Sequence, residues 1–366
     1  YQLRYIIHPS MLHGGTNYGR IIISTAYQSF TVEITVTQSE GAAERRRRRE
    51  YRDACQRLFG YYVEMRVKEF RSNLLVNGML TELARLRDSF DAPDTLQLLH
   101  IEIYLMAGQK EKAGLLLADI KERILARRAD EIDAYCYYYY LRSLYSESEE
   151  EKEQLVRILR FYYEGEHPSQ TVYFLLLLTD ESKRENPLAT MEEMKALFKR
   201  GCRSPFLYLA ACRMYAAQPL LLNRIGAFEL QALIFGAKKG MLGRELAVRI
   251  ALLSEEERGF RPSYYRLLCR LAERYEDTEL VAAICRILIQ GDKKEPEHFF
   301  WYEMGVGLDV RLTRLYEYYL YSLPKDREGE LPQEIYLYFS YTNTLDDHSR
   351  AALYDNVLAH FEAGSQ

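Results

Sequence analysis

The segment "GLDVRLTRLYEYYLYSLP", residues 307–324, holds the side chains best suited to binding chemistry. It contains four tyrosines and two arginines. Tyrosine combines a large apolar ring with a hydroxyl that can reach water or a partner. Exposed tyrosine and arginine are the usual anchors of protein interfaces. We therefore predict a partner-binding set that consists of Arg311, Arg314, Tyr318 and Tyr321.

The spacing of this segment predicts one helix over 309–322, which begins at an Asp and ends before a Pro. On a helical wheel its side chains form two stripes. The first stripe comprises Leu308, Leu312, Leu315, Tyr316, Tyr319 and Leu323, and the second comprises the four predicted binding residues. Because stacked hairpins cover most of an internal helix, we expect Tyr318 to be buried and the two arginines to be partly exposed.

Catalytic and metal-binding patterns do not stand out. None of the 53 acidic residues lies in a Gly- and Trp-rich loop of the kind that frames a sugar-cleaving pair, and the chain has one Trp. The histidines lack metal-ligand spacing, and His8 and His13 suit a turn. No phosphate-binding loop or nucleophile elbow is present. The sequence therefore predicts no catalytic residue, no cofactor and no metal, and an enzyme is the less favoured interpretation.

The run "ERRRRREYR", residues 44–52, is the most conspicuous cluster of charge. Consecutive arginines with nearby tyrosines are typical of nucleic-acid binding. The alternative is a solvated helix start, which we favour because no other basic patch extends it. The acidic run "SESEEEKE", residues 146–153, and the net charge of −4 also count against nucleic-acid binding.

The run "DAYCYYYYLRSLY", residues 133–145, repeats the tyrosine pattern. Consecutive tyrosines must cover several faces of a helix, so we expect most of them to pack and leave a stacking platform as the alternative. The six cysteines form no C-x-x-C pair, which predicts reduced core thiols. We favour a cytoplasmic location. The longest apolar run, Phe174–Leu178, is far shorter than the roughly 20 residues that span a bilayer.

The elements that must position these residues divide at residue 40. Residues 1–40 predict a β-strand segment, with two paired strands on either side of "AYQS", as at the edge of a truncated β-sandwich. The chain starts at Tyr1 within a strand-like pattern, so we expect it to be cut from a longer protein. Residues 41–366 show helical spacing almost throughout and predict an α-helical repeat array.

A repeat is visible in the second half. Outer helices are predicted to begin at Leu242, Thr278, Asp309 and Leu345, in steps of 36, 31 and 36 residues. A step near 34 is typical of tetratricopeptide hairpins, which bury their faces by stacking. The predicted fold is mostly α: a helical-hairpin (tetratricopeptide-like) solenoid with a short N-terminal β segment.

Three segments, "RLTRLYEYY", "YLYFSYTNTLD" and "ALYDNVLAHF", carry a resemblance to a known family. The sequence resembles an uncharacterised family of very large bacterial proteins from Clostridia-type Firmicutes, described as a domain of unknown function. The resemblance extends through most of residues 155–361. It implies β-sandwich modules followed by tetratricopeptide-like helical repeats, and it implies no activity, cofactor or catalytic residue.

These observations favour a non-catalytic scaffold whose groove holds a protein or peptide partner. One alternative is a glycan-active enzyme of the α/α-toroid kind, in which the helices close into a ring. A second alternative is an RNA-binding helical repeat protein, which would show steep salt dependence. Nucleic acid is the less favoured partner. The arrangement of the helices distinguishes these alternatives, because an open row favours the scaffold and a closed ring favours the enzyme.

Overall fold

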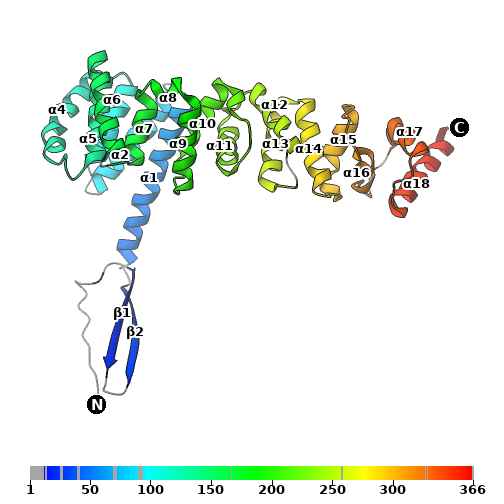
Figure 1. Cartoon of the computed structure of the whole chain (residues 1–366), viewed down its shortest axis with the longest axis horizontal. Helices are drawn as coiled ribbons and strands as arrows, with labels where there is room; N and C mark the ends of the chain where they lie inside the picture. The colour runs from blue at the N-terminus through cyan, green and yellow to red at the C-terminus, as the bar shows by residue number, and fades with distance from the viewer. Residues whose placement is uncertain are drawn as a thin grey trace. The chain divides into compact units, whose positions relative to one another are not determined.

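The computed structural model describes residues 12, 15–24, 28–38, 42–68, 72–89, 94–165, 167–256, 259–325, 327 and 329–364. These residues form eighteen α-helices and one two-stranded antiparallel sheet (Figure 1). The prediction of a mostly α fold with a short N-terminal β segment is therefore confirmed.

The chain separates into two compact units, Tyr1–Ser146 and Glu147–Gln366. The first unit contains the β segment together with five helices, and the second contains helices alone. The domain division predicted at residue 40 separates strands from helices, and it stays a prediction.

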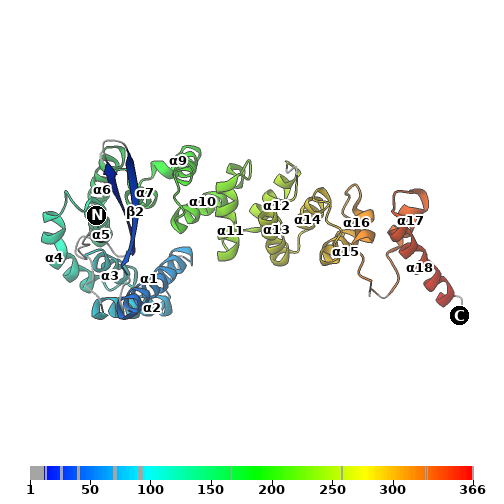
Figure 2. The same ribbon diagram turned by 90° about the horizontal axis from the view of Figure 1, so that it is seen from below.

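The β segment is a hairpin of β1 (Gly15–Ser24) and β2 (Ser29–Gln38), paired from Gly15 opposite Gln38 to Ser24 opposite Ser29 (Figure 2). The two paired strands predicted around "AYQS" are confirmed. Opposite residues share a face, so one face is apolar and the other carries threonines and the Arg20–Glu33 ion pair at 3.6 Å. The apolar face consists of Ile21, Ile23, Phe30, Val32, Ile34 and Val36.

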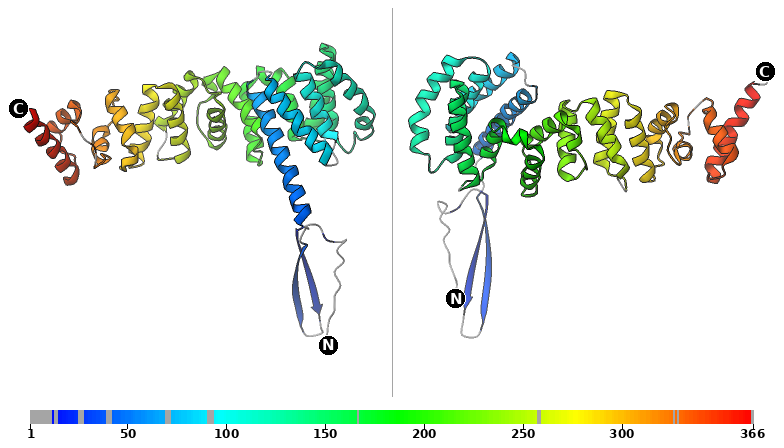
Figure 3. Two further views of the ribbon diagram at one scale, coloured as in Figure 1. Left: turned by 180° about the vertical axis from the view of Figure 1, so that it is seen from behind. Right: turned by 45° about the horizontal axis from the view of Figure 1, so that its top comes forward.

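Five helices complete the first unit (Figure 3). They are α1 (Ala42–Lys68), α2 (Asn73–Ser89), α3 (Asp94–Met106), α4 (Lys110–Ala126) and α5 (Ile132–Ser146). Each helix packs against the next, and α3 also packs against α5. The buried side chains of Met79, Leu83, Leu86 and Ile103 lie in the core of this unit.

The second unit is a succession of helices. They are α6 (Glu149–Glu164), α7 (Gln170–Thr179), α8 (Ser182–Glu185), α9 (Pro187–Lys199), α10 (Pro205–Ala217), α11 (Ala227–Lys239), α12 (Arg244–Leu252), α13 (Pro262–Tyr275), α14 (Thr278–Gln290), α15 (Phe299–Gly307), α16 (Leu315–Tyr321), α17 (Gln333–Tyr341) and α18 (Asp347–Gly364). One cluster of buried apolar side chains runs from Tyr173 to Leu353. The unit therefore has a continuous core.

Local signals set the ends of these helices. The Ser169 hydroxyl accepts the backbone N–H of Val172 at the start of α7. The Asp277 carboxylate accepts the backbone N–H of Glu279 at the start of α14. Both contacts satisfy an N–H group that has no partner within its own helix. Gly240 follows α11 with a φ of 70°, which a glycine adopts without steric cost.

Several side-chain contacts join helices of the second unit at sequence separations of 32 or 33 residues. Arg244 donates to Asp277 at 2.8 Å, 33 residues away. Arg286 donates to the Ser254 hydroxyl at 3.0 Å, 32 residues away. Alternate helices also pack on one another, α11 on α13, α12 on α14, α14 on α16 and α16 on α18. The separations lie close to the repeat of about 34 residues that the sequence predicts.

Limited proteolysis is expected to leave residues near 155–361 as one resistant fragment, because their core is continuous. We expect trypsin to release this fragment early and to degrade it only after global unfolding, as read by mass spectrometry. Cleavage into several pieces that each stay folded would show that the core is divided.

Candidate functional site

The helix predicted over 309–322 is shorter in the structure, where α16 begins at Leu315. That prediction is wrong for residues 309–314, because Asp309 lies in the turn that follows the end of α15 and does not start a helix. The N–H of Asp309 donates to Val306, and the N–H of Val310 donates to Gly305 at 2.9 Å. These two backbone hydrogen bonds are typical of a helix C-terminus, where the residue after the helix adopts a positive φ. Asp309 has a φ of 51°.

Residue 314 also has an unusual backbone, with a φ of 69° directly before α16. A non-glycine residue in this region carries steric strain. The two predicted stripes therefore do not lie on a single helix. In the first stripe Leu315 and Tyr319 are buried, whereas Leu312 is half-buried.

Tyr318 is buried, at 1% exposure, which confirms the prediction of burial. Its hydroxyl donates to the Asp292 carboxylate, and its ring lies 5.9 Å from that of Tyr302. Burial, together with this hydrogen bond, raises the pKa of Tyr318 to about 12. The residue is therefore a packed anchor of α16 and is not available on the surface.

The two arginines are exposed, and the Arg311 side chain is 90% accessible. The Arg314 guanidinium lies 5.1 Å from the Tyr318 ring centroid. Lys294 approaches the half-buried Tyr321 ring at 4.9 Å. We name this set the cation–tyrosine surface: Lys294, Arg311, Arg314 and Tyr321. Sequence reasoning missed Lys294, because it lies outside the segment 307–324 from which the binding residues were predicted.

Beside this surface, α16 holds a buried carboxylate. Glu317 is 3% exposed, and its Oε1 accepts the Tyr338 hydroxyl at 3.1 Å and the Thr344 hydroxyl at 2.9 Å. Its Oε2 has no hydrogen-bond partner among the described residues. The contacts tie α16 to α17 and to the turn before α18.

A second buried carboxylate lies in the first unit, where Glu102 of α3 is fully buried. Arg66 of α1 forms an ion pair with it. The hydroxyl of Tyr62 donates to Glu102 at 2.9 Å, and that of Tyr137 donates to the same oxygen. Arg66 also donates to the Tyr140 hydroxyl at 3.3 Å. We name these five residues the Glu102 cluster.

Burial raises the pKa of the three tyrosines in the Glu102 cluster. Burial and the nearby Glu102 carboxylate raise the pKa of Tyr62 and of Tyr137 well above the usual range. Burial opposes the charge of Arg66, but the same carboxylate raises its pKa above the usual value. The cluster is thus an ion pair with neutral tyrosine donors, buried where no substrate can reach the carboxylate.

Most of the tyrosines of α5 are packed, as the sequence predicts. Tyr135, Tyr138 and Tyr140 are buried, and Tyr139 is half-buried with its ring 4.8 Å from that of Tyr135. These tyrosines of α5 are therefore packed side chains and do not form an exposed stacking platform.

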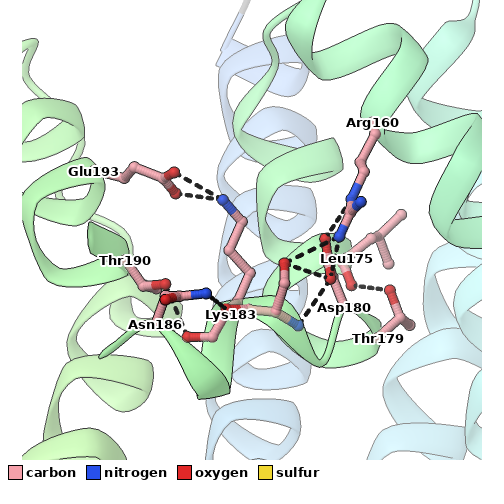
Figure 4. Close-up of polar contacts among 9 residues, drawn as sticks. Arg160, Leu175, Thr179, Asp180, Lys183, Asn186, Thr190 and Glu193 are labelled. Atoms are coloured by element: carbon pink, nitrogen blue, oxygen red, sulfur yellow. Dashed lines mark hydrogen bonds and ion pairs between the residues drawn. The ribbon is translucent and has the colours of Figure 1, made fainter. Parts of the chain in front are cut away.

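Two ion pairs hold the region from α6 to α9 (Figure 4). Arg160 binds both carboxylate oxygens of Asp180 at 2.7 Å, and Lys183 binds Glu193 at 2.6 Å. Asp180 is buried, and although burial opposes its charge, the hydrogen bonds from Arg160 and Ser182 lower its pKa. These pairs connect consecutive helices and serve the packing of the unit.

The cysteines and the metal-binding side chains of the described ranges form no disulfide and no metal centre. All six cysteines are free, as predicted, and four are buried. Burial raises the pKa of four thiols to about 12: Cys136, Cys212, Cys269 and Cys285. The part of the chain that the structure describes holds no group of three metal-binding side chains. His8 and His13 lie outside it.

The arginine run lies near the start of α1. Arg46–Arg49 are exposed, and Arg46 donates to Glu50 at 2.9 Å, whereas the side chain of Arg45 lies outside the described part. The described helices include none that is both long and apolar enough to cross a bilayer.

Replacing Arg45–Arg49 by glutamine is expected to change the melting temperature little, because exposed charge changes usually alter stability by less than about 0.5 kcal/mol each. We also expect at most weak RNA binding by the wild type. Submicromolar RNA binding at physiological salt that disappears in the glutamine variant would contradict the solvated interpretation of this run.

Comparison with known proteins identifies a family. Neither the curated proteins nor the solved structures gave a match. The model of the family of unknown function DUF5717, N-terminal, matches residues 1–366. Because the match covers the whole chain, the protein belongs to the DUF5717 N-terminal family of unknown function.

Proposed function

We propose that this protein is a non-catalytic scaffold of tetratricopeptide-like helical hairpins that binds a protein or peptide partner. The bonds between hairpins at separations of 32 and 33 residues support the repeat array. One observation carries the binding role. Arg311 and Arg314 are exposed in the turn before α16, and the Arg314 guanidinium lies 5.1 Å from the ring centroid of the buried Tyr318.

Partner recognition fits the chemistry of the cation–tyrosine surface. Arginine and tyrosine contribute more binding energy than most residues at interfaces. Asp292 forms an ion pair with Lys294 at 3.2 Å and accepts the Tyr318 hydroxyl, so these contacts hold the part of the surface around Lys294 and Tyr318 in place. Side chains that are already held in place lose less conformational entropy when a partner binds.

The proposal extends to the parent protein. We propose that β1 and β2 belong to a β-sandwich module of a Clostridia-type bacterial protein. The apolar face of the hairpin supports this proposal, because Phe30 is 55% and Val32 is 45% exposed. A two-stranded sheet is marginal in water until such a face is covered. A cytoplasmic location is part of the same proposal.

The arrangement of helices in the second unit favours the scaffold over the α/α-toroid enzyme. A closed ring would bring the last helices back to the first ones, whereas α10 to α18 follow one another in a row (Figures 1 and 2). The buried carboxylates of this unit also face tyrosine, serine, threonine and arginine partners. RNA binding is tested by the glutamine variant of the arginine run.

The test is differential capture followed by reconstitution. Immobilised wild-type protein and an Arg311→Ala/Arg314→Ala variant are exposed to an extract of the source bacterium, and captured proteins are compared by mass spectrometry. A partner lost from the variant is then purified and titrated. We expect its Kd to rise at least about tenfold, since hot-spot truncations cost about 2 kcal/mol or more.

A matched control is available on α13, where Arg266 and Arg270 are exposed and four residues apart. Their double replacement by alanine removes the same charge from another surface of the unit. Equal loss of the partner in both variants would mean that binding depends on the overall charge of the unit. That result would contradict the assigned surface. A purified partner that binds both variants like the wild type would contradict it as well.

A further inference from the structure

Two cations of the cation–tyrosine surface lie beside the ring of Tyr318. The Arg314 guanidinium is 5.1 Å from the centroid of this ring, and the Lys294 ammonium is 6.0 Å from it. The same ammonium lies 4.9 Å from the ring centroid of Tyr321. Because Tyr318 is buried, both cations contact a ring whose position is fixed by packing. The two connections that flank α15 thus bring two positive groups close together.

The guanidinium of Arg314 is not used by an ion pair. Arg314 is exposed, and its contact with the Tyr318 ring leaves it without a carboxylate partner among the described residues. A guanidinium presents five N–H donors in a planar fork that matches the two oxygens of a carboxylate. Arg314 can therefore bind an anion without first breaking an ion pair within the chain.

The neighbouring cation already binds a carboxylate. Asp292 lies 3.2 Å from the Lys294 ammonium and accepts the Tyr318 hydroxyl. The hydrogen bonds from Tyr318 and Lys294, together with the positive charges of Lys294 and Arg314, lower the pKa of Asp292. Its carboxylate therefore stays ionised at neutral pH. This contact shows that the positive groups around Tyr318 suit a carboxylate in both geometry and charge.

We propose that the cation–tyrosine surface is the binding site for an acidic segment of a partner protein, in which Arg314 binds the carboxylate of an Asp or Glu side chain. The proposal deepens the proposed scaffold function and rests on it. A second carboxylate of the segment would pair with Arg311, three residues before Arg314 in the same turn. The Arg311–Asp309 contact, at 3.8 Å between exposed side chains, is a weak ion pair that such a segment can displace.

Nucleic acid suits this surface less well than an acidic peptide does. Three cations against the carboxylates of Asp292 and Asp309 leave a net charge of +1. Nucleic acids are usually bound by longer basic surfaces that contact many phosphates, with aromatic rings exposed for base stacking. Here the Tyr318 ring is buried and the Tyr321 ring is half-buried. A short acidic segment needs no more than these few cations.

The probe is a fluorescently labelled peptide of about ten residues that contains four glutamates, and its matched control has glutamine at those four positions. Binding of each peptide to the full chain is followed by fluorescence anisotropy. We expect saturable binding of the glutamate peptide that weakens as salt rises. The glutamine peptide should bind at least about tenfold more weakly, because hydrogen bonds to charged groups are stronger than those to neutral ones.

The decisive variant is Arg314→Gly. Residue 314 has a φ of 69°, which glycine adopts without strain, so the substitution removes the guanidinium and leaves the turn intact. We expect the Kd of the glutamate peptide to rise at least about tenfold while the melting temperature changes little. Arg270→Ala, which removes an exposed arginine from α13, should bind the peptide like the wild type.

A second variant is expected to change affinity in the opposite direction. Asp292→Asn keeps an acceptor for the Tyr318 hydroxyl and tolerates the φ of 50° at this position, but it removes a negative charge beside Lys294. The glutamate peptide should therefore bind about threefold more tightly. Weaker binding by this variant would contradict the proposed recognition of negative charge.

Three other results would overturn the proposal: equal binding of the glutamate and glutamine peptides, unchanged binding by Arg314→Gly, or tighter Arg314-dependent binding of RNA or of a phosphoserine peptide. The scaffold function is tested separately by capture. A partner that is lost from the Arg311→Ala/Arg314→Ala variant but binds through a segment without acidic residues would remove the acidic ligand and leave the scaffold standing. Arg314-dependent binding of the glutamate peptide with no partner lost from that variant would contradict the scaffold function and support the acidic ligand.

Discussion

Glu102→Ala is expected to lower the free energy of unfolding of the first unit by about 3–5 kcal/mol, the usual cost of breaking a buried ion pair. Glu102 is fully buried, and the Arg66 side chain is only 18% exposed. Its removal leaves the guanidinium without a counter-charge and two tyrosine hydroxyls without their acceptor. Urea denaturation monitored by circular dichroism would measure the loss.

The control is the double variant Glu102→Leu/Arg66→Met. Because apolar replacement of a buried pair is often neutral, it should recover most of the stability that Glu102→Ala loses. Tyr137→Phe should cost about 1 kcal/mol, since it removes one hydrogen bond and no charge. A loss below about 1 kcal/mol for Glu102→Ala would mean that water solvates Arg66 in the variant, and the cluster would not hold α1 to α3.

Tyr318→Ala is expected to destabilise the second unit by about 3–5 kcal/mol, as large aromatic-to-alanine changes in cores do. The ring is buried between Tyr302 and Tyr321. Leu315→Ala should cost about 2–5 kcal/mol for the same reason, because Leu315 is 1% exposed. Leu312→Ala should cost less, since Leu312 is half-buried. Thermal melts of the three variants would give the order.

Tyr318→Phe separates packing from hydrogen bonding. It keeps the ring and removes the hydroxyl that donates to Asp292, so the expected cost is about 0.5–1.5 kcal/mol. A wild-type melt for Tyr318→Ala would refute its role as a packed anchor and would return this residue to the binding surface.

Much of the helical pattern could be predicted from the sequence where caps and apolar spacing agree. The outer helix predicted to begin at Thr278 is α14, which does begin there because Asp277 caps its start, and Gly291 follows its end. A proline also marks the start of α13, where Pro262 occupies the first helical position. The prediction over 309–322 failed because aspartate serves two purposes, capping a helix start and adopting positive φ after a helix end.

The buried polar contacts were harder to predict. Glu317 meets Tyr338 and Thr344, which lie 21 and 27 residues away, and no periodicity relates them. Such partners meet only after the helices pack. One signal was present at Glu102, since a single carboxylate interrupts the apolar run "LLHIEIYLM" of α3. An isolated acid in such a run requires a buried partner, although the sequence does not show that Arg66 provides it.

The short sequence separations of the bonds between hairpins have a consequence for folding speed. To form the bonds between Ser254 and Arg286 and between Arg244 and Asp277, the chain must close loops of only 32 and 33 residues. The entropy of closing a loop depends on its own length and not on the length of the whole chain. Proteins whose contacts join residues close together in the sequence also fold faster. The array can therefore gain hairpins without its slowest closure becoming slower.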